Sequence, residues 1–198
     1  FVGYAIEDGP DGYQSFDDAS DLEGRVALML RYEPIDESGA SRWGGESFSD
    51  ASGLNDKFRS VMDRGATGIM LVNPPGATYG RRGLESFRRS RRFRPTMDFP
   101  VVHLSAQAAD AFLAEADEQG RDLAALRALA DEGNVTTIDF KDDVPARLST
   151  HVHSGLRMAQ NVAGVYPGRG ELAEEWLVIG GHYDHLGRGY LGSRAPDS

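Results

Sequence analysis

The amino-acid sequence predicts a folded α+β protein, because short apolar runs alternate with amphipathic stretches. Apolar runs with the length of a buried strand occur at 25–31, 66–73 and 99–104, bounded by glycine, proline or charged residues. Stretches with apolar residues at helical spacing occur at 54–64 and 106–118. With 198 residues, of which 40% are hydrophobic, the chain can bury a core of its own.

The amino-terminal part of the chain predicts strands joined by a crossover helix. Phe1 to Ile6 is predicted as a short strand, and the buried strand over 25–31 ends before Pro34, which has no amide hydrogen to donate to a sheet. The stretch over 54–64 is predicted as a helix that connects this strand with the strand over 66–73. Such a helix is the usual connection between two parallel strands.

The next predicted elements are a strand and two helices. The run over 99–104 predicts a short strand, and Ser105 is expected to cap the helix over 106–118, because its hydroxyl can accept from an amide of the first turn. A second helix is predicted over 122–130, and Gly133 after it is typical of a helix end.

An acidic segment marks a predicted domain boundary near Val144, which divides the chain into residues 1–143 and residues 144–198. The second part contains apolar residues in runs and in alternation, with a Gly- and Glu-rich turn between the last two runs. It therefore predicts three strands, over 147–153, 156–168 and 177–181.

A histidine and an aspartate follow the last of these strands. Leu177 to Ile179 form a continuous apolar run, two glycines come next, and His182 and Asp184 would project from one face if the chain stays extended. An imidazole beside a carboxylate suits zinc, since the carboxylate can bind the ion or fix the imidazole tautomer. The alternative interpretation is a solvent-exposed, histidine-rich turn.

Two segments of the second part carry a family resemblance. Asn-Val-Ala-Gly-Val-Tyr-Pro-Gly at 161–168 and Trp-Leu-Val-Ile-Gly-Gly-His-Tyr-Asp-His-Leu-Gly at 176–187 resemble the opening of the catalytic domain of the co-catalytic di-zinc aminopeptidases. That group includes bacterial leucyl aminopeptidases and transferrin-receptor-like carboxypeptidases. The resemblance implies that His182 is a zinc ligand, that Asp184 is the catalytic carboxylate that orients the site, and that His185 is a neighbour.

The first part of the chain carries a resemblance of its own. The segments at 24–30, 57–72 and 99–106 are similar in order to the protease-associated domain, a compact β-rich module with flanking helices. Members of the aminopeptidase group often carry this module ahead of the zinc-binding half of the catalytic domain. The two resemblances together imply a protease-associated domain at 1–143, followed at 144–198 by the first strands of an α/β zinc-peptidase domain.

The implied zinc centre is incomplete in this sequence. The family pattern continues with a bridging aspartate, a glutamate pair that supplies the general base, a further acidic ligand and a second histidine, which are expected beyond Ser198. A two-metal hydrolase needs both ions a few ångströms apart, so that one activates water and both stabilise the developing oxyanion. The parent protein is expected to be a zinc metallopeptidase that hydrolyses peptide substrates, whereas this fragment is expected to bind no zinc and to be inactive alone.

A competing interpretation is a non-catalytic protein-interaction module that gates substrate access or docks a partner through the protease-associated domain. Seven arginines between residues 81 and 94, with Glu85 as the only acid, fit either a docking patch for an acidic partner or a solvated loop. His151 and His153 share a face of a predicted strand and fit either a metal site or a solvated surface. His103 is expected to be a packed or edge histidine.

Charge and composition exclude several classes of partner. The formal net charge of -10 argues against a general affinity for nucleic acid or anionic membrane, and no apolar run approaches the roughly 20 residues that span a bilayer. The sequence contains no cysteine, which excludes disulfides and cysteine-ligated zinc. A secreted or periplasmic location is expected only from the habits of the family.

Overall fold

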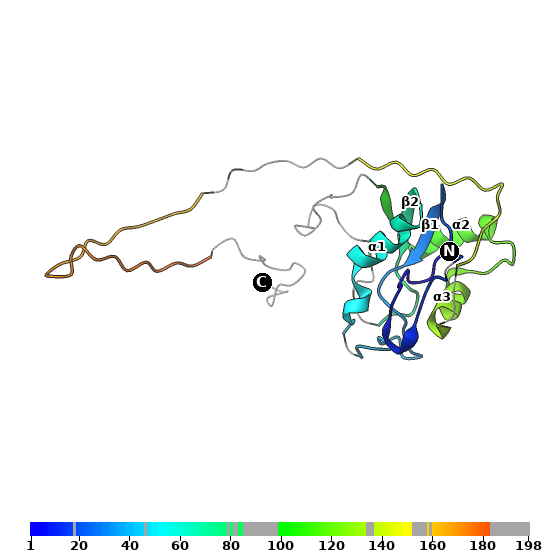
Figure 1. The fold of residues 1–198 in the computed structure, drawn as a ribbon, viewed down its shortest axis with the longest axis horizontal. Helices are drawn as coiled ribbons and strands as arrows, with labels where there is room; N and C mark the ends of the chain where they lie inside the picture. The colour runs from blue at the N-terminus through cyan, green and yellow to red at the C-terminus, as the bar shows by residue number, and fades with distance from the viewer. Residues whose placement is uncertain are drawn as a thin grey trace. The chain divides into compact units, whose positions relative to one another are not determined.

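The computed structural model describes most of the chain and divides it into two units. The described residues are 1–17, 19–45, 47–78, 80, 83–84, 99–133, 137–151, 158 and 160–182. Those up to residue 151 belong to one folded unit, and those from residue 158 onward belong to a second. Every helix and strand among the described residues lies in the first unit (Figure 1).

The first unit is built on a parallel sheet of three strands in the order β1-β2-β3. The strands are β1 (Val26–Leu30), β2 (Gly68–Val72) and β3 (Val101–Leu104). Val26 is aligned with Gly68, and Ile69 is aligned with Val101. The predicted strands over 25–31, 66–73 and 99–104 are thus confirmed, since each contains one observed strand.

Three helices accompany the sheet: α1 (Leu54–Asp63), α2 (Ala106–Ala116) and α3 (Leu123–Glu132). Short 3-10 turns occur at Pro10–Gly12 and Asp50–Ser52. As predicted, α1 connects β1 to β2, and the Ser105 hydroxyl caps α2 by accepting from the Ala108 amide at 3.1 Å.

Alternating strand residues build two separate apolar cores, one on each face of the sheet. Leu28, Leu30, Met70 and Val72 pack with buried residues of α2 and α3. Ala27, Met29, Ile69 and Leu71 pack with Phe58 and Val61 of α1. The alternation follows from the two-residue period of a strand. The result is a three-layer arrangement, with α1 on one face and α2 and α3 on the other (Figure 1).

The amino-terminal segment differs from its prediction. Residues 1–6 are all buried, yet they form no strand beyond a single antiparallel bridge between Val2 and Thr137. The Val2 amide donates to the Leu28 carbonyl at 3.0 Å, and the Leu30 amide donates to the Gly3 carbonyl at 2.8 Å, so the segment lines the edge of β1. Gly3 and Ala5 have φ of 52° and 54°, and such left-handed positions interrupt a regular ladder.

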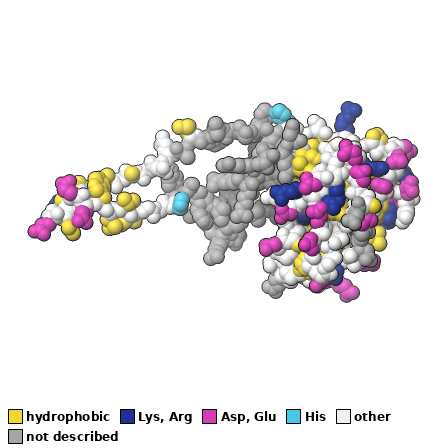
Figure 2. Space-filling model, viewed as in Figure 1, with side chains coloured by type: hydrophobic (Ala, Val, Ile, Leu, Met, Phe, Trp, Pro, Cys, Tyr) yellow, Lys and Arg dark blue, Asp and Glu magenta, His cyan; other side chains and the backbone are white. Residues whose placement is uncertain are grey.

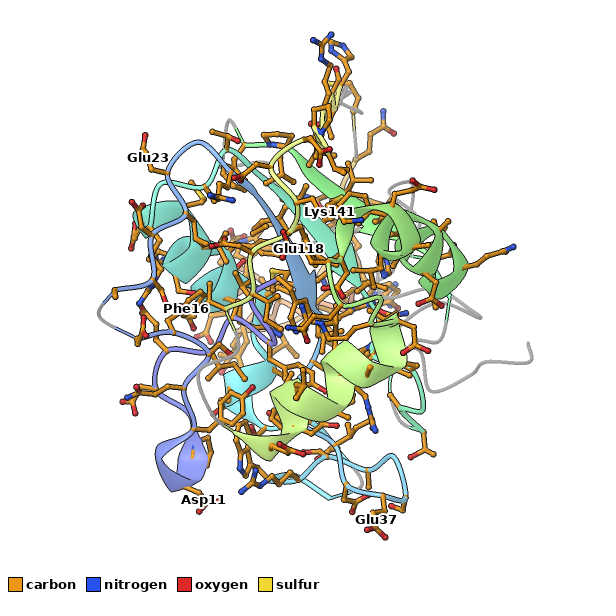
Figure 3. The ribbon with its side chains drawn as sticks, turned by 90° about the vertical axis from the view of Figure 1, so that its right-hand side faces the viewer. Asp11, Phe16, Glu23, Glu37, Glu118 and Lys141 are labelled. Carbon is orange, nitrogen blue, oxygen red and sulfur yellow. The ribbon has the colours of Figure 1, made fainter. Side chains whose placement is uncertain are left out.

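The segment after α3 returns across the first unit. Phe140 packs edge-to-face on Phe112 of α2, with ring centroids 5.6 Å apart. Lys141 donates its backbone amide to the Ala116 carbonyl at 3.0 Å and its ammonium to the Glu115 carbonyl at 2.9 Å, beside the end of α2 (Figure 3). These contacts fasten residues 137–141 to the body of the unit.

The observed fold is mixed α and β, as predicted, but the described residues contain as many α-helices as strands. The β-rich character that the protease-associated resemblance implies is therefore not visible in them. Leu148, which lies after the predicted boundary near Val144, packs against the core that the sheet forms with α2 and α3. The boundary itself stays a prediction. No helix among the described residues is long and apolar enough to cross a membrane.

Candidate functional site

The predicted zinc ligand His182 belongs to the second unit, and we call residues 160–182 of that unit the arm. The arm contains a turn, in which the Ala173 amide donates to the Gly170 carbonyl at 3.2 Å and the Glu175 amide donates to the Leu172 carbonyl at 3.0 Å. The described residues on both sides of this turn form no strand. The turn predicted between the last two strands is present, and the strands themselves are not.

The apolar side chains of the arm are exposed. Trp176, Leu177, Val178 and Ile179 are 78, 86, 85 and 88% exposed, and apolar side chains are spread along the arm in the space-filling view (Figure 2). The prediction that residues 177–181 form a strand buried on both faces is wrong for this structure. A buried strand needs neighbours to pair its backbone and layers to cover its side chains, and no described residue supplies either to the arm.

The other strand predictions of this region are also corrected. Residues 147–151 of the strand predicted over 147–153 are described and are irregular. The described residues of the strand predicted over 156–168 are irregular and exposed. The sequence over 147–153 alternates in hydrophobicity, but a strand forms only where a neighbouring strand accepts its backbone hydrogen bonds.

Only some of the predicted site residues lie among the described residues. His182 is exposed, whereas Asp184 and His185 lie outside the described residues. His151 is also exposed, and His153 lies outside the described residues. All seven arginines between residues 81 and 94 also lie outside the described residues. The pairing of His182 with Asp184 therefore stays a prediction.

The described residues do not form a metal site by themselves. They contain no group of three or more His, Asp or Glu side chains placed to hold one ion. His182 alone does not suffice, since zinc sites in proteins take three or four protein ligands. His103, on β3, contacts the Asn73 side-chain oxygen through Nε2 at 3.2 Å, which agrees with the packed or edge histidine that the sequence predicts.

Two buried ionisable side chains that were not predicted from the sequence, Lys57 and Glu33, lie near the end of β1. Lys57 of α1 is 2% exposed and Glu33 is fully buried. The Lys57 ammonium donates to the Leu30 carbonyl at 3.0 Å and to the Tyr32 carbonyl. Its Nζ also lies 5.7 Å from the centre of the Tyr4 ring. Lysine and glutamate are rarely buried this completely unless they are paired.

The Glu33 carboxylate is satisfied by three donors from the following loop. It accepts hydrogen bonds from the hydroxyls of Ser41 and Ser49, and the Ser49 amide donates to it at 2.8 Å. These bonds draw two distant points of the loop onto one buried carboxylate. By contrast, Glu37 of the same loop is exposed and points away from the body (Figure 3).

Burial dominates the electrostatics of the pair. It lowers the pKa of Lys57 from 10.5 to about 7, although the Glu33 carboxylate acts to raise that pKa and the Arg31 guanidinium lowers it further. The physical reason is that an ammonium ion loses its hydration when it is buried, whereas a neutral amine loses much less. Burial therefore favours the neutral amine of Lys57.

A hollow of about 770 Å³ adjoins Lys57. It lies between the loop at residues 5–10, the turn at 49–51 and the first turns of α1. A second hollow, of about 530 Å³, is lined by Asp17, Asp21, Glu23 and Asp139 together with Arg25. Arg25 pairs with Asp139 at 3.4 Å, so part of that negative charge is neutralised within the chain.

One signal in the sequence could have indicated the buried lysine. Lys57 occurs among Leu54, Phe58 and Val61, all at the helical spacing that identifies the buried face of α1. A lysine on that face has to find acceptors within the core. No comparable signal marks Glu33, because the residues around it follow no regular period.

Comparisons with known proteins do not identify the chain. No protein-family model matches the sequence, and neither the curated proteins nor the solved structures give a match. The family resemblance described above therefore depends on the sequence motifs, and what it implies about activity is a proposal.

Proposed function

We propose that this chain belongs to a zinc-dependent, aminopeptidase-like exopeptidase that hydrolyses peptide bonds. In this proposal residues 1–143 are its protease-associated domain, and residues 144–198 are the first part of its catalytic domain. The observation that supports it is the exposed run from Trp176 to Ile179 before His182: its composition is that of a buried strand, and it is available to join a sheet made by other residues.

The proposal assigns separate tasks to the residues after that run. His182 would bind a zinc ion through one ring nitrogen, and Asp184 would fix the tautomer of the ring through the other. When bound, a pair of zinc ions supplies an activated water and polarises the scissile carbonyl. The remaining ligands and the general base would have to come from residues other than those described.

A test of the proposal uses the natural full-length gene product. Zinc content, measured by plasma emission, and hydrolysis of aminoacyl p-nitroanilides are compared between the wild type and His182→Ala. His151→Ala is the matched control, because His151 is likewise an exposed histidine outside regular structure. We expect His182→Ala to lose zinc and activity, and His151→Ala to keep both. Unchanged zinc and turnover in His182→Ala would refute the assignment.

A second candidate function is a non-catalytic module that gates substrate access or docks a protein partner. It is favoured by one observation: the described residues up to 151 contain helices, strands and two apolar cores, as a folded module would. A full-length gene product that is folded, zinc-free and inactive on every aminoacyl nitroanilide would favour this module. For the 198-residue chain itself we expect no hydrolysis, even with zinc added.

A further inference from the structure

The loop after β1 is fastened to the body of the protein by buried polar contacts. We call residues 31–49, which follow β1, the β1 loop. Glu33, near its start, accepts from Ser41 in the middle of the loop and from Ser49 at its end. One buried carboxylate thus closes the loop on itself.

Lys57 connects this closed loop to α1. Its ammonium donates to the carbonyls of Leu30 and Tyr32, which lie on either side of the end of β1. Tyr32 has a φ of 66°, a left-handed conformation that is costly for a bulky residue and that needs surrounding contacts to persist. Its ring stacks on Phe48, with centroids 4.2 Å apart, so both ends of the β1 loop depend on the position held by Lys57.

We propose that Lys57 and Glu33 form a proton-linked latch, in which neutral Lys57 keeps the β1 loop closed on α1 and protonated Lys57 favours its opening. The geometry that carries the proposal is the burial of both side chains together with two sets of hydrogen bonds. Lys57 bonds to the carbonyls of Leu30 and Tyr32 where the β1 loop begins, and Glu33 bonds to the middle and the end of the loop. A neutral amine still has two hydrogens for the carbonyls of Leu30 and Tyr32. The closed loop therefore does not need the charge.

The groups that face Lys57 determine the pH range of the latch. Glu33 and Arg31 face it from the segment after β1, and Tyr4 faces it from the amino-terminal segment. The Tyr4 hydroxyl donates to Asp131 of α3 at 2.7 Å, so α3 is linked through Tyr4 to the groups around Lys57. The adjoining hollow adds five charged residues: Glu7, Asp8, Asp50, Asp56 and Arg59.

The direction of the effect follows from proton linkage. Lys57 has a pKa of about 7 when the loop is closed, and its pKa would return towards about 10.4 if opening exposed it to water. The open loop therefore binds more protons between these values, so lower pH favours opening and higher pH favours closure. Between pH 9 and pH 7 the opening constant should increase about 50-fold, and below pH 7 it should change little.

Hydrogen exchange of the 198-residue chain tests the latch. Protection factors, corrected for the intrinsic pH dependence of exchange, are measured for the amides of Arg42 and Ser49 and for the amides of β2. The Arg42 amide donates to the Pro34 carbonyl at 2.9 Å and the Ser49 amide to Glu33, so both report closure of the loop. We expect the loop amides to be less protected than β2 at every pH, and their protection to increase about 50-fold from pH 7 to pH 9.

Two variants separate the latch from a merely structural role. Lys57→Met has no titrating group and should abolish the pH dependence of loop protection. Glu33→Gln removes the charge that raises the pKa of Lys57, so the pH dependence should extend below pH 7, where the wild type changes only about twofold between pH 5.5 and 7. The proposal is overturned if wild-type loop protection is independent of pH, or if the loop amides are as protected as β2. It is also overturned if Lys57→Met retains the wild-type dependence.

Discussion

The global stability of the protein should increase with pH above neutrality because of one buried lysine. In the folded protein Lys57 has a pKa of about 7, whereas in the unfolded chain it keeps its proton up to about pH 10.4. Between these values the unfolded state binds more protons, so the free energy of unfolding increases with pH. Below pH 7 the lysine is protonated in both states, and its contribution is constant and least favourable.

The size of the effect follows from the same two pKa values. One pKa unit corresponds to about 1.36 kcal/mol, so the complete shift is worth about 5 kcal/mol if unfolding is followed well above pH 10. Over the accessible range from pH 7 to pH 9, the lysine should add about 2 kcal/mol to the free energy of unfolding. That is a substantial part of the 5–15 kcal/mol or so that stabilises a typical domain.

Urea unfolding followed by circular dichroism at pH 6, 7, 8 and 9 measures this effect. Lys57→Met should lose the increase, and Lys141→Met should keep it, because the Lys141 ammonium bonds to the Glu115 carbonyl near the surface. Every other titrating group contributes alike to the three proteins. The wild type minus Lys57→Met difference therefore isolates the lysine. A slope that is equal in wild type and Lys57→Met would refute the reasoning.

Two further predictions concern backbone conformation and acid stability. Gly65 and Gly24 have φ of 85° and 70°, but an added Cβ at Gly65 would lie 2.9 Å from the Glu23 Cα, whereas at Gly24 nothing lies within 4 Å. Urea unfolding should show that Gly24→Ala lowers the free energy of unfolding by about 1 kcal/mol. Gly65→Ala should lower it by about 1–3 kcal/mol more, because of the contact with Glu23. Equal losses for the two variants would show that this contact does not matter. Hydrogen bonds from Arg121 lower the pKa of Asp117 in the folded protein. The ionised carboxylate therefore stabilises the fold at pH values above the ordinary Asp pKa, and this stabilisation is lost as the pH falls through the lowered pKa of the folded state. Asp117→Asn should weaken the loss of stability on acidification to pH 3, and an unchanged acid profile would argue against the ion pair.

The elements of the first unit could be predicted because their signals are local. The apolar runs around β1 and β2 and the amphipathic spacing of α1 are properties of neighbouring residues, and they predicted the parallel pair joined by a helix. The cap of α2 at Ser105 is equally local. These signals do not depend on which segment packs against which, so they hold before tertiary contacts are considered.

Residues 1–6 and the arm at residues 160–182 show where the same signals fail. Both are apolar enough to predict strands, and neither contains one. Residues 1–6 are buried beside β1 in an irregular conformation, whereas the arm is exposed. A strand is a relation between two segments, and its sequence alone does not supply the partner. The pairing of His182 with Asp184 depends on such a partner and remains a prediction.

The sequence by itself determined where the helices and strands of the first unit lie, since hydrophobic period and capping residues act over a few positions. Only the tertiary structure decided that Lys57 and Glu33 are buried together, because the carbonyls at the end of β1 and the serines of the β1 loop come from separate parts of the chain. Burial then sets the charge of Lys57, since a low-polarity surrounding favours the neutral amine.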